Sequence, residues 1–132
     1  QRLVRKFAAD KEKYGLKKAE VDELATHCNM ARVLEILRAE KIIKAKDTLL
    51  DIDFYRPKPS KDSLTGYKGR MGIYEVLPVT QAIKELVVKK ASTKDITEQA
   101  IKEGMRIMFE DGLVKAAMGL TSIEEVLRVI SE

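Results

Sequence analysis

Three groups of residues in this 132-residue chain carry side chains that could do acid–base, metal or phosphate chemistry. In the first group, His27 and Cys28 are adjacent, and they are the only histidine and the only cysteine. Side chains of neighbouring helix residues point about 100° apart, so this pair cannot hold a metal ion without further ligands. We therefore expect Cys28 to be a small core residue and His27 to lie at the surface or at the edge of the core.

The second group is a pair of carboxylates, Asp51 and Asp53, in a segment of alternating polarity. On a strand both side chains would face the same side, where paired carboxylates can transfer protons or bind a hard cation. No histidine lies nearby in the sequence to complete either kind of site. We therefore favour the alternative, which is a solvated polar face of the strand.

The third group is a basic turn, Gly66-Tyr67-Lys68-Gly69-Arg70, which leads into the apolar residues 71–77. Two glycines three residues apart indicate unusual backbone angles, so the turn should hold Tyr67 and Arg70 in defined positions. Lys68 and Arg70 could bind a phosphate, but phosphate-binding loops usually lead into a helix, and here a strand is predicted to follow. The sequence shows no phosphate-binding glycine loop and no catalytic constellation, so we do not expect this chain alone to be an enzyme.

The elements that must position these residues begin with a mixed N-terminal half. Alternating polarity predicts short strands, and apolar residues spaced three and four apart predict amphipathic helices. The predicted elements are a strand at 1–5, helices at 17–29 and from Met30 onward, a half-exposed strand at 50–54, a loop at 56–63 and a strand at 71–77. The last strand is apolar on both faces except for Glu75, so we expect it to be covered on both sides, with Glu75 paired or facing a functional surface.

The C-terminal half is predicted to be helical throughout. A helix from Thr80 to Lys90 should turn Ala82, Ile83, Leu86 and Val87 inward and leave Gln81, Lys84, Glu85 and Lys89 exposed. A further helix contains Ile96, Ala100 and Ile101, and Gly104 is expected to end it. The apolar positions from Met105 to Ala117 form a continuous stripe, in which Gly112 indicates a close approach between helices. Gly119 is a suitable C′ residue, and Thr121 to Glu124 reads as a capping box that opens the last helix.

The order of these predicted elements places the chain in the α+β class, with a small sheet and helices in the N-terminal half followed by a C-terminal helical bundle. We expect one domain over residues 1–132, with a mixed part at 1–78 and a helical part at 79–132. Apolar residues make up 45% and charged residues 35%, which is typical of a globular chain and not of a disordered or membrane-spanning one. A single cysteine excludes an internal disulfide and fits a reducing compartment. Because the first residue is Gln, we expect the chain to be part of a longer protein.

The net charge of +4 raises the alternative of a small basic module that binds nucleic acid. The first twenty residues hold seven Lys or Arg and three Asp or Glu, whereas the other 112 residues hold 18 of each sign. Nucleic-acid domains usually spread basic residues along a face with stacking aromatics, and aromatic residues are only 5% here. We therefore interpret the basic segment as solvated or in contact with an acidic partner, and expect no nucleic acid.

Several segments match one family in order and along the whole chain. They are Gln1-Arg2-Leu3-Val4-Arg5, Thr65 to Arg70, Gly72 to Leu77, the helix Ala82 to Val87, and a C-terminal run with Gly104-Met105, Asp111 to Lys115, Gly119, Thr121 and Glu124 to Arg128. With these motifs the chain resembles the C-terminal part of the motor ATPases of bacterial type II secretion and type IV pilus assembly. The motif and interface candidates on this basis are Gln1, Arg2, Tyr67, Arg70, Glu75, Lys84, Glu85 and Lys89.

The resemblance implies a non-catalytic module of a hexameric cytoplasmic ATPase, located at the inner membrane. Such a module would pack on its own ATPase core and neighbouring subunits and pass motion to an inner-membrane platform protein. ATP and Mg²⁺ would bind elsewhere in the parent protein. Many assembly-type members hold a structural zinc with four cysteines, and the corresponding positions here are Ala8, Lys11, Pro59 and Asp62. None of them is a cysteine, so we expect no zinc.

Overall fold

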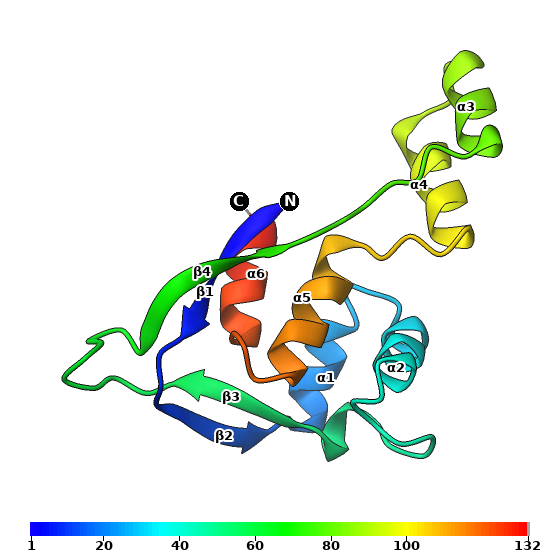
Figure 1. The fold of residues 1–132 in the computed structure, drawn as a ribbon. Helices are drawn as coiled ribbons and strands as arrows, with labels where there is room; N and C mark the ends of the chain where they lie inside the picture. Colours follow the sequence, from blue (N-terminus) through cyan, green and yellow to red (C-terminus); the bar gives the residue numbers. More distant parts are fainter. Residues whose placement is uncertain (132) are drawn as a thin grey trace.

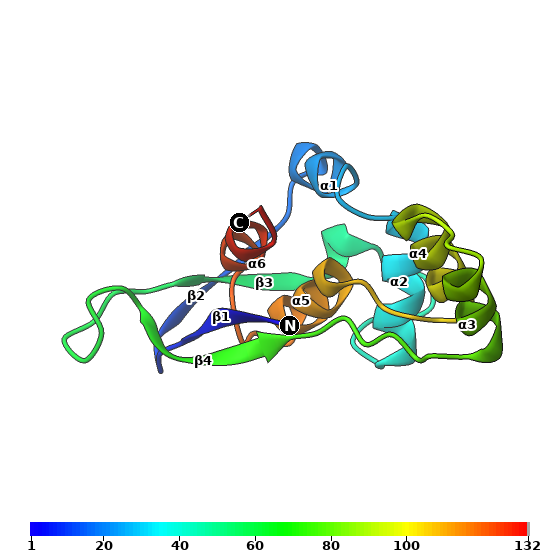
Figure 2. The same cartoon turned by 90° about the horizontal axis from the view of Figure 1, so that it is seen from above.

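The computed structural model describes residues 1–131, which form two antiparallel sheets of two strands each, six α-helices and a short 3₁₀ helix. Strand β1 (Arg2–Phe7) pairs with β4 (Tyr67–Ile73), and β2 (Lys11–Gly15) pairs with β3 (Asp53–Pro57). Figures 1 and 2 show both sheets on one side of the helices α5 and α6. The predicted α+β class is confirmed.

The turn before β4 has the backbone conformation that its glycines indicate. Gly66 and Gly69 have φ angles of +73° and +76°, in the left-handed region that favours glycine. Gly66 also lies against the end of β3, since a Cβ atom there would come within 2.8 Å of the backbone nitrogen of Lys58. The carbonyl of Gly66 accepts a hydrogen bond of 2.9 Å from the N–H of Ala8. The turn therefore joins the ends of the two sheets.

The main core lies between the sheets and four helices: α1 (Lys18–Leu24), α2 (Met30–Ala39), α5 (Met108–Ala117) and α6 (Ile123–Ser131). A short 3₁₀ helix, η1 (Leu49–Asp51), also contributes to it. Gly112 marks the close approach that we predicted between helices, because a Cβ atom there would lie 2.5 Å from Cγ1 of Val126. Gly119, with φ of +73°, follows the end of α5.

Helices α3 (Gln81–Val88) and α4 (Thr93–Lys102) stand apart from this core. They pack mainly against each other, around the buried side chains of Ile83, Ala100 and Met105. Figure 1 shows the pair extending away from the rest of the molecule. We call residues 81–102 the arm, residues 1–73 and 108–131 the main body, and the joining segments 74–80 and 103–107 the first and second connectors. Helices α5 and α6 thus share a core with the N-terminal half, not with α3 and α4.

Several predicted element bounds were wrong. The strand expected at 71–77 ends at Ile73, and the apolar residues after it are uncovered, with Val76 70% exposed. The strand expected at 50–54 begins only at Asp53, because Thr48 and Asp51 form a capping box that closes the turn of η1. Val87 was expected to face inward, but it is 57% exposed because α4 covers only one narrow side of α3. Among the described residues no helix is long and apolar enough to cross a membrane.

Leu113 should be one of the residues on which the main core depends. It is fully buried in mid-α5, so Leu113→Ala should lower the free energy of unfolding by about 2–5 kcal/mol. Lys6→Ala, at an exposed position of β1, should change it by no more than about 0.5 kcal/mol. Urea unfolding of both variants checks this order. A larger loss of unfolding free energy from Lys6→Ala would contradict the assignment of Leu113 to the core and of Lys6 to the surface.

Candidate functional site

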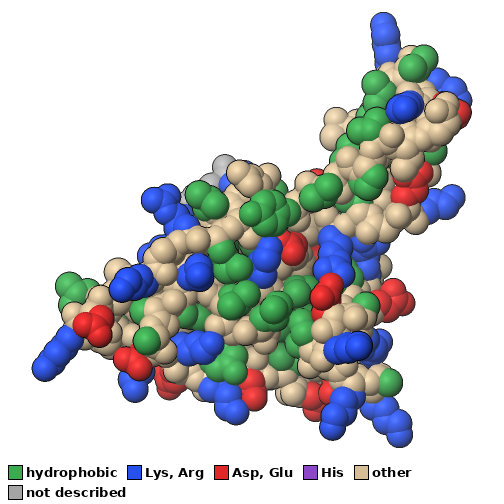
Figure 3. Space-filling model, viewed as in Figure 1, with side chains coloured by type: hydrophobic (Ala, Val, Ile, Leu, Met, Phe, Trp, Pro, Cys, Tyr) green, Lys and Arg blue, Asp and Glu red, His purple; other side chains and the backbone are tan. Residues whose placement is uncertain are grey.

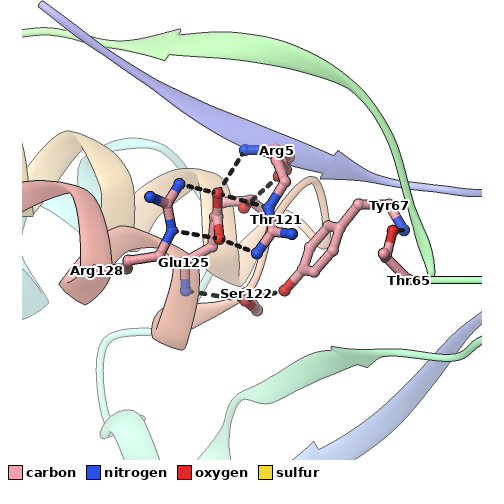
Figure 4. Close-up of polar contacts among 7 residues, drawn as sticks. All are labelled: Arg5, Thr65, Tyr67, Thr121, Ser122, Glu125 and Arg128. Carbon is pink, nitrogen blue, oxygen red and sulfur yellow. Dashed lines mark hydrogen bonds and ion pairs between the residues drawn. The ribbon is translucent and has the colours of Figure 1, made fainter.

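The candidate site is a cluster of polar side chains around one buried carboxylate, Glu125 of α6. Its side chain is 1% exposed. Arg5 of β1 donates to both carboxylate oxygens, from Nε at 3.0 Å and from Nη2 at 2.8 Å, and its backbone N–H adds a third hydrogen bond at 3.1 Å. Arg128, one turn further along α6, donates from Nη2 at 2.7 Å. Figure 4 shows the carboxylate between the two guanidinium groups.

The local sequence explains why Glu125 reaches this position. The hydroxyl of Ser122 accepts a hydrogen bond of 3.1 Å from the N–H of Glu125, as the cap of a helix does. The capping residue is therefore Ser122, and our prediction of a box from Thr121 to Glu124 was one residue early. The hydroxyl of Thr121 instead donates to the carbonyl of Arg5 at 2.7 Å. Thr121 therefore binds β1, and the next residue, Ser122, caps α6.

Tyr67 connects the basic turn to the same cluster (Figure 4). Its hydroxyl lies 2.6 Å from the hydroxyl of Ser122, and its ring lies 4.4 Å from the guanidinium carbon of Arg5. Phe7 stacks on the same ring, with 5.6 Å between ring centroids. A cation over an aromatic face is attracted by the ring quadrupole, which adds to the stacking. The turn, β1 and α6 are therefore held by one set of contacts.

The electrostatics of the cluster favour a permanently ionised carboxylate. Burial alone would raise the pKa of Glu125, but the hydrogen bonds from Arg128 and Arg5 outweigh it and lower the pKa to about 2. Burial raises the pKa of Tyr67, although its bond to Ser122 acts in the opposite direction. A carboxylate with such a low pKa is a poor proton donor or acceptor at neutral pH. The cluster therefore positions segments of the chain and does not suit acid–base catalysis.

The predicted site residues fall into two separate groups in the structure. Near β1 and β4, Arg2 donates to the carbonyl of Val129, Tyr67 lies in the Glu125 cluster, and Gln1 and Arg70 are exposed. On the arm, the side chains of Lys84, Glu85 and Lys89 are exposed, as we expected.

Glu75 lies between these groups in the sequence, and it has a hydrogen-bond partner although it is exposed. Its carboxylate accepts a hydrogen bond of 3.2 Å from the N–H of Met108, the first residue of α5. The carboxylate of Asp111 in the same helix turn accepts from the N–H of Tyr74 at 2.8 Å. Negative charge is favourable at a helix N-terminus. The first connector is therefore attached to the start of α5.

The basic N-terminal segment is only partly solvated, which corrects our interpretation. Arg5 pairs with Glu125, and Lys11 donates to the carbonyl of Gly119 at 2.6 Å. Lys13 pairs with Asp53 at 3.0 Å, on an exposed surface. Asp51 and Asp53 are both exposed, as predicted, but they do not lie on one strand. The charge excess at the N-terminus thus serves internal contacts in part.

His27 is exposed and lies near the ring of Phe109, with 5.8 Å between ring centroids. Cys28 packs half-buried against the main core, and burial raises the pKa of its thiol to about 11. A thiol with this pKa is protonated at neutral pH and therefore a weak nucleophile. Both residues fit the structural roles that we predicted.

Arg32 of α2 and Glu110 of α5 form a second buried ion pair, which the sequence analysis missed. Nε of Arg32 lies 2.7 Å from Oε1 of Glu110, whose side chain is 2% exposed. The second carboxylate oxygen of Glu110 accepts from the N–H of Ile107 at 3.0 Å. Only the capping position of Glu110, three residues after Ile107, could have been found from local spacing, because Arg32 lies far away in the sequence.

The structure also tests whether a zinc ion would fit. Of Ala8, Lys11, Pro59 and Asp62, only Asp62 has a side chain of the kind that binds zinc. Within residues 1–131 no group of three or more His, Cys, Asp or Glu side chains is placed to hold a metal ion. The residues at these positions therefore do not fit a tetrahedral zinc site.

Comparisons with known proteins identify the family and the relatives of this chain. Residues 1–128 match the family described as Type II/IV secretion system protein. The chain is 35% identical over 112 residues to the type IV pilus assembly ATPase PilB of Pseudomonas aeruginosa, an alignment that covers 83% of this chain and 19% of that protein. It is 44% identical over 82 residues to the type II secretion system protein E of Xanthomonas campestris, which covers 62% of this chain and 14% of that protein.

The chain therefore belongs to the Type II/IV secretion system protein family. Its curated relatives include secretion proteins and ATPases of pilus assembly, and the chain spans less than a fifth of the length of the two named above.

The stability of the fold at low pH should report on Glu125. Because its pKa is about 2 in the fold and 4.5 for an ordinary glutamate, ionisation stabilises the fold above about pH 4.5, and this contribution is lost as the pH falls toward 2. In Glu125→Gln the free energy of unfolding should start lower and fall less over that range. Urea unfolding at a series of pH values measures both. Glu35→Gln, at an exposed position of α2, should keep the parent profile, and a parent profile for Glu125→Gln would contradict this account.

Proposed function

We propose that this chain is a non-catalytic module of a hexameric ATPase that powers type II secretion or type IV pilus assembly. Membership in the Type II/IV secretion system protein family carries the proposal. In this view the module packs on its own ATPase core and on neighbouring subunits and transmits motion to a platform protein of the inner membrane. The parent would work on the cytoplasmic side of that membrane, and ATP and Mg²⁺ would bind to it outside these residues.

Two features of the structure support a mechanical role. The Glu125 cluster ties the first strand, the basic turn and the last helix into one body, and a rigid body can pass on a displacement without deforming. The arm, in contrast, presents an exposed face. Besides Lys84, Glu85 and Lys89, it carries the exposed apolar residues Val87 and Val88.

Hydrophobic side chains also follow the edge that leads from the main body onto the arm, as Figure 3 shows. In the first connector Val76 and Val79 are 70% and 62% exposed. Apolar side chains beside charged ones are typical of a protein–protein contact. The arm and the first connector are therefore the surface that we assign to a partner or a neighbouring subunit.

Charge reversal on the arm should impair the contact with a partner or a neighbouring subunit without lowering the stability of the fold. Lys84→Glu with Lys89→Glu in the full-length parent should leave folding intact, because both side chains are exposed. Secretion or piliation should be strongly reduced, because like charges set against a partner cost several kcal/mol. Thermal melting of this chain and a transport or piliation assay in cells measure the two effects.

The matched control is Lys44→Glu with Lys46→Glu, two exposed lysines in the main body. The control should show parental melting and parental transport. Parental transport by the arm variant would refute the contact, and a collapsed melting temperature would mean that this face is buried.

The proposal includes folding without zinc, because none of Ala8, Lys11, Pro59 and Asp62 is a cysteine. Phe7, which precedes Ala8, stacks on Tyr67, and the N–H of Ala8 donates to the carbonyl of Gly66, so these contacts join the end of β1 to the basic turn. Purified chain should therefore contain far less than one zinc per molecule, and a strong chelator should leave its melting temperature unchanged. A stoichiometric zinc content or chelator-induced unfolding would contradict this.

A further inference from the structure

The arm is built as a unit that is closed on itself. Its apolar core consists of Ile83 and Ala100 together with Met105 of the second connector, and within residues 1–131 none of these belongs to the core of the main body. At the base of the arm the two connectors are joined by a hydrogen bond of 2.8 Å from the hydroxyl of Thr80 to the carboxylate of Glu103. The internal contacts of the arm therefore do not depend on where it lies relative to the main body.

The side chains of the first connector have little packing, whereas the second connector is packed at Met105 and Ile107 and is open only around Gly104. In the first connector the backbone leaves β4 at Ile73, and most of its side chains are exposed. The second connector contains Gly104, with φ of +100° and open space around its Cα. Exposed segments with few buried contacts are where local motion is least costly.

The contacts that hold the arm in place are mainly polar, and Arg32 of α2 makes the central ones. Its Nη1 donates to the carbonyl of Ile101 at 3.0 Å, and its Nη2 donates to the carbonyl of Met105. Its Nε pairs with the buried carboxylate of Glu110 at 2.7 Å. One side chain of the main body thus binds the end of α4, the second connector and the start of α5.

A second ion pair, between Arg106 and Glu40 at 2.6 Å, lies on the surface. Their side chains are 37% and 42% exposed, and an exposed pair of this kind contributes little. Glu75 and the N–H of Tyr74 attach the first connector to α5, so among these contacts it is Arg32 that reaches the arm directly, at the carbonyl of Ile101. The acceptors of the Arg32 bonds to the arm and the second connector are backbone carbonyls. If the arm took a different position, the carbonyls could accept hydrogen bonds from water instead.

We propose that the arm moves as one rigid unit on its two connectors and that Arg32 holds it in the position seen here. Arg32 is a positioning residue, and Glu110 keeps its guanidinium aimed at the two carbonyls. Loss of Arg32 should free the arm and leave both cores intact. This inference concerns the chain itself, so it can stand even if the proposed motor function fails.

The test measures the distance between the arm and the main body. Spin labels are placed on Lys84→Cys and Lys46→Cys in a Cys28→Ser background, and the distance distribution is recorded by pulsed electron paramagnetic resonance. The labelled reference should give a narrow distribution, and Arg32→Met should make it about twofold broader or shift it. Arg56→Met is the matched control, because Arg56 stacks on Tyr14 in the main body and should leave the distribution narrow.

Circular dichroism and thermal melting confirm that each labelled variant is folded. Glu110→Gln, which weakens the same contact while keeping Arg32, should broaden the distribution in the same direction. An unchanged distribution in folded Arg32→Met would overturn the proposal. So would global unfolding of both Arg32→Met and Glu110→Gln, because it would make these residues part of the core and not a restraint on the arm.

Discussion

The ion pair between Arg5 and Glu125 is the contact on which the arrangement of the main body depends. A carboxylate with 1% exposure is costly unless its lone pairs are satisfied, and here two guanidinium groups and a backbone N–H satisfy them. Arg5 also covers the ring of Tyr67, and Tyr67 in turn reaches Ser122. The first strand, the glycine turn and the last helix are therefore fixed by one network, although they are far apart in the sequence.

The main body, which this network holds together, differs from the arm in how it is packed. The main body has a single apolar core that takes residues from both ends of the chain, whereas the arm has a small core of its own. A hydrogen bond from Arg32 of the main body reaches the arm at the carbonyl of Ile101, and a second one from the same side chain reaches the second connector at Met105. A module with a firm body and an exposed, polar-tethered arm suits the transmission of motion that we propose for this family member.

The sequence predicted features that depend on local spacing. Gly112 and Gly119 were identified from their positions in and after an apolar stripe, and the glycine turn at 66–69 was identified from its residues alone. The exposed charges of α3 followed from helical periodicity. These features succeed because the physical requirement, such as a positive φ angle or an amphipathic face, lies within a few residues.

Features that depend on distant partners were missed. Nothing near Arg32 indicates that its guanidinium meets Glu110, and nothing near Arg5 indicates a buried carboxylate at Glu125. The strand predicted at 71–77 also depends on a distant partner, since the pairing of β4 with β1 ends at Arg2 and Ile73 and the apolar residues that follow leave the sheet. Val87 was assigned to the core by periodicity, but only one helix covers α3.

A double-mutant cycle tests the central claim about the main body most directly. Arg5→Met, Glu125→Gln and the combined variant are compared with the parent by urea unfolding at neutral pH. If the pair organises the main body, each single change is destabilising and the coupling free energy is about 2 kcal/mol, since residues in one buried network do not behave additively. A coupling free energy near zero would mean that Arg5 and Glu125 act independently and would contradict the account.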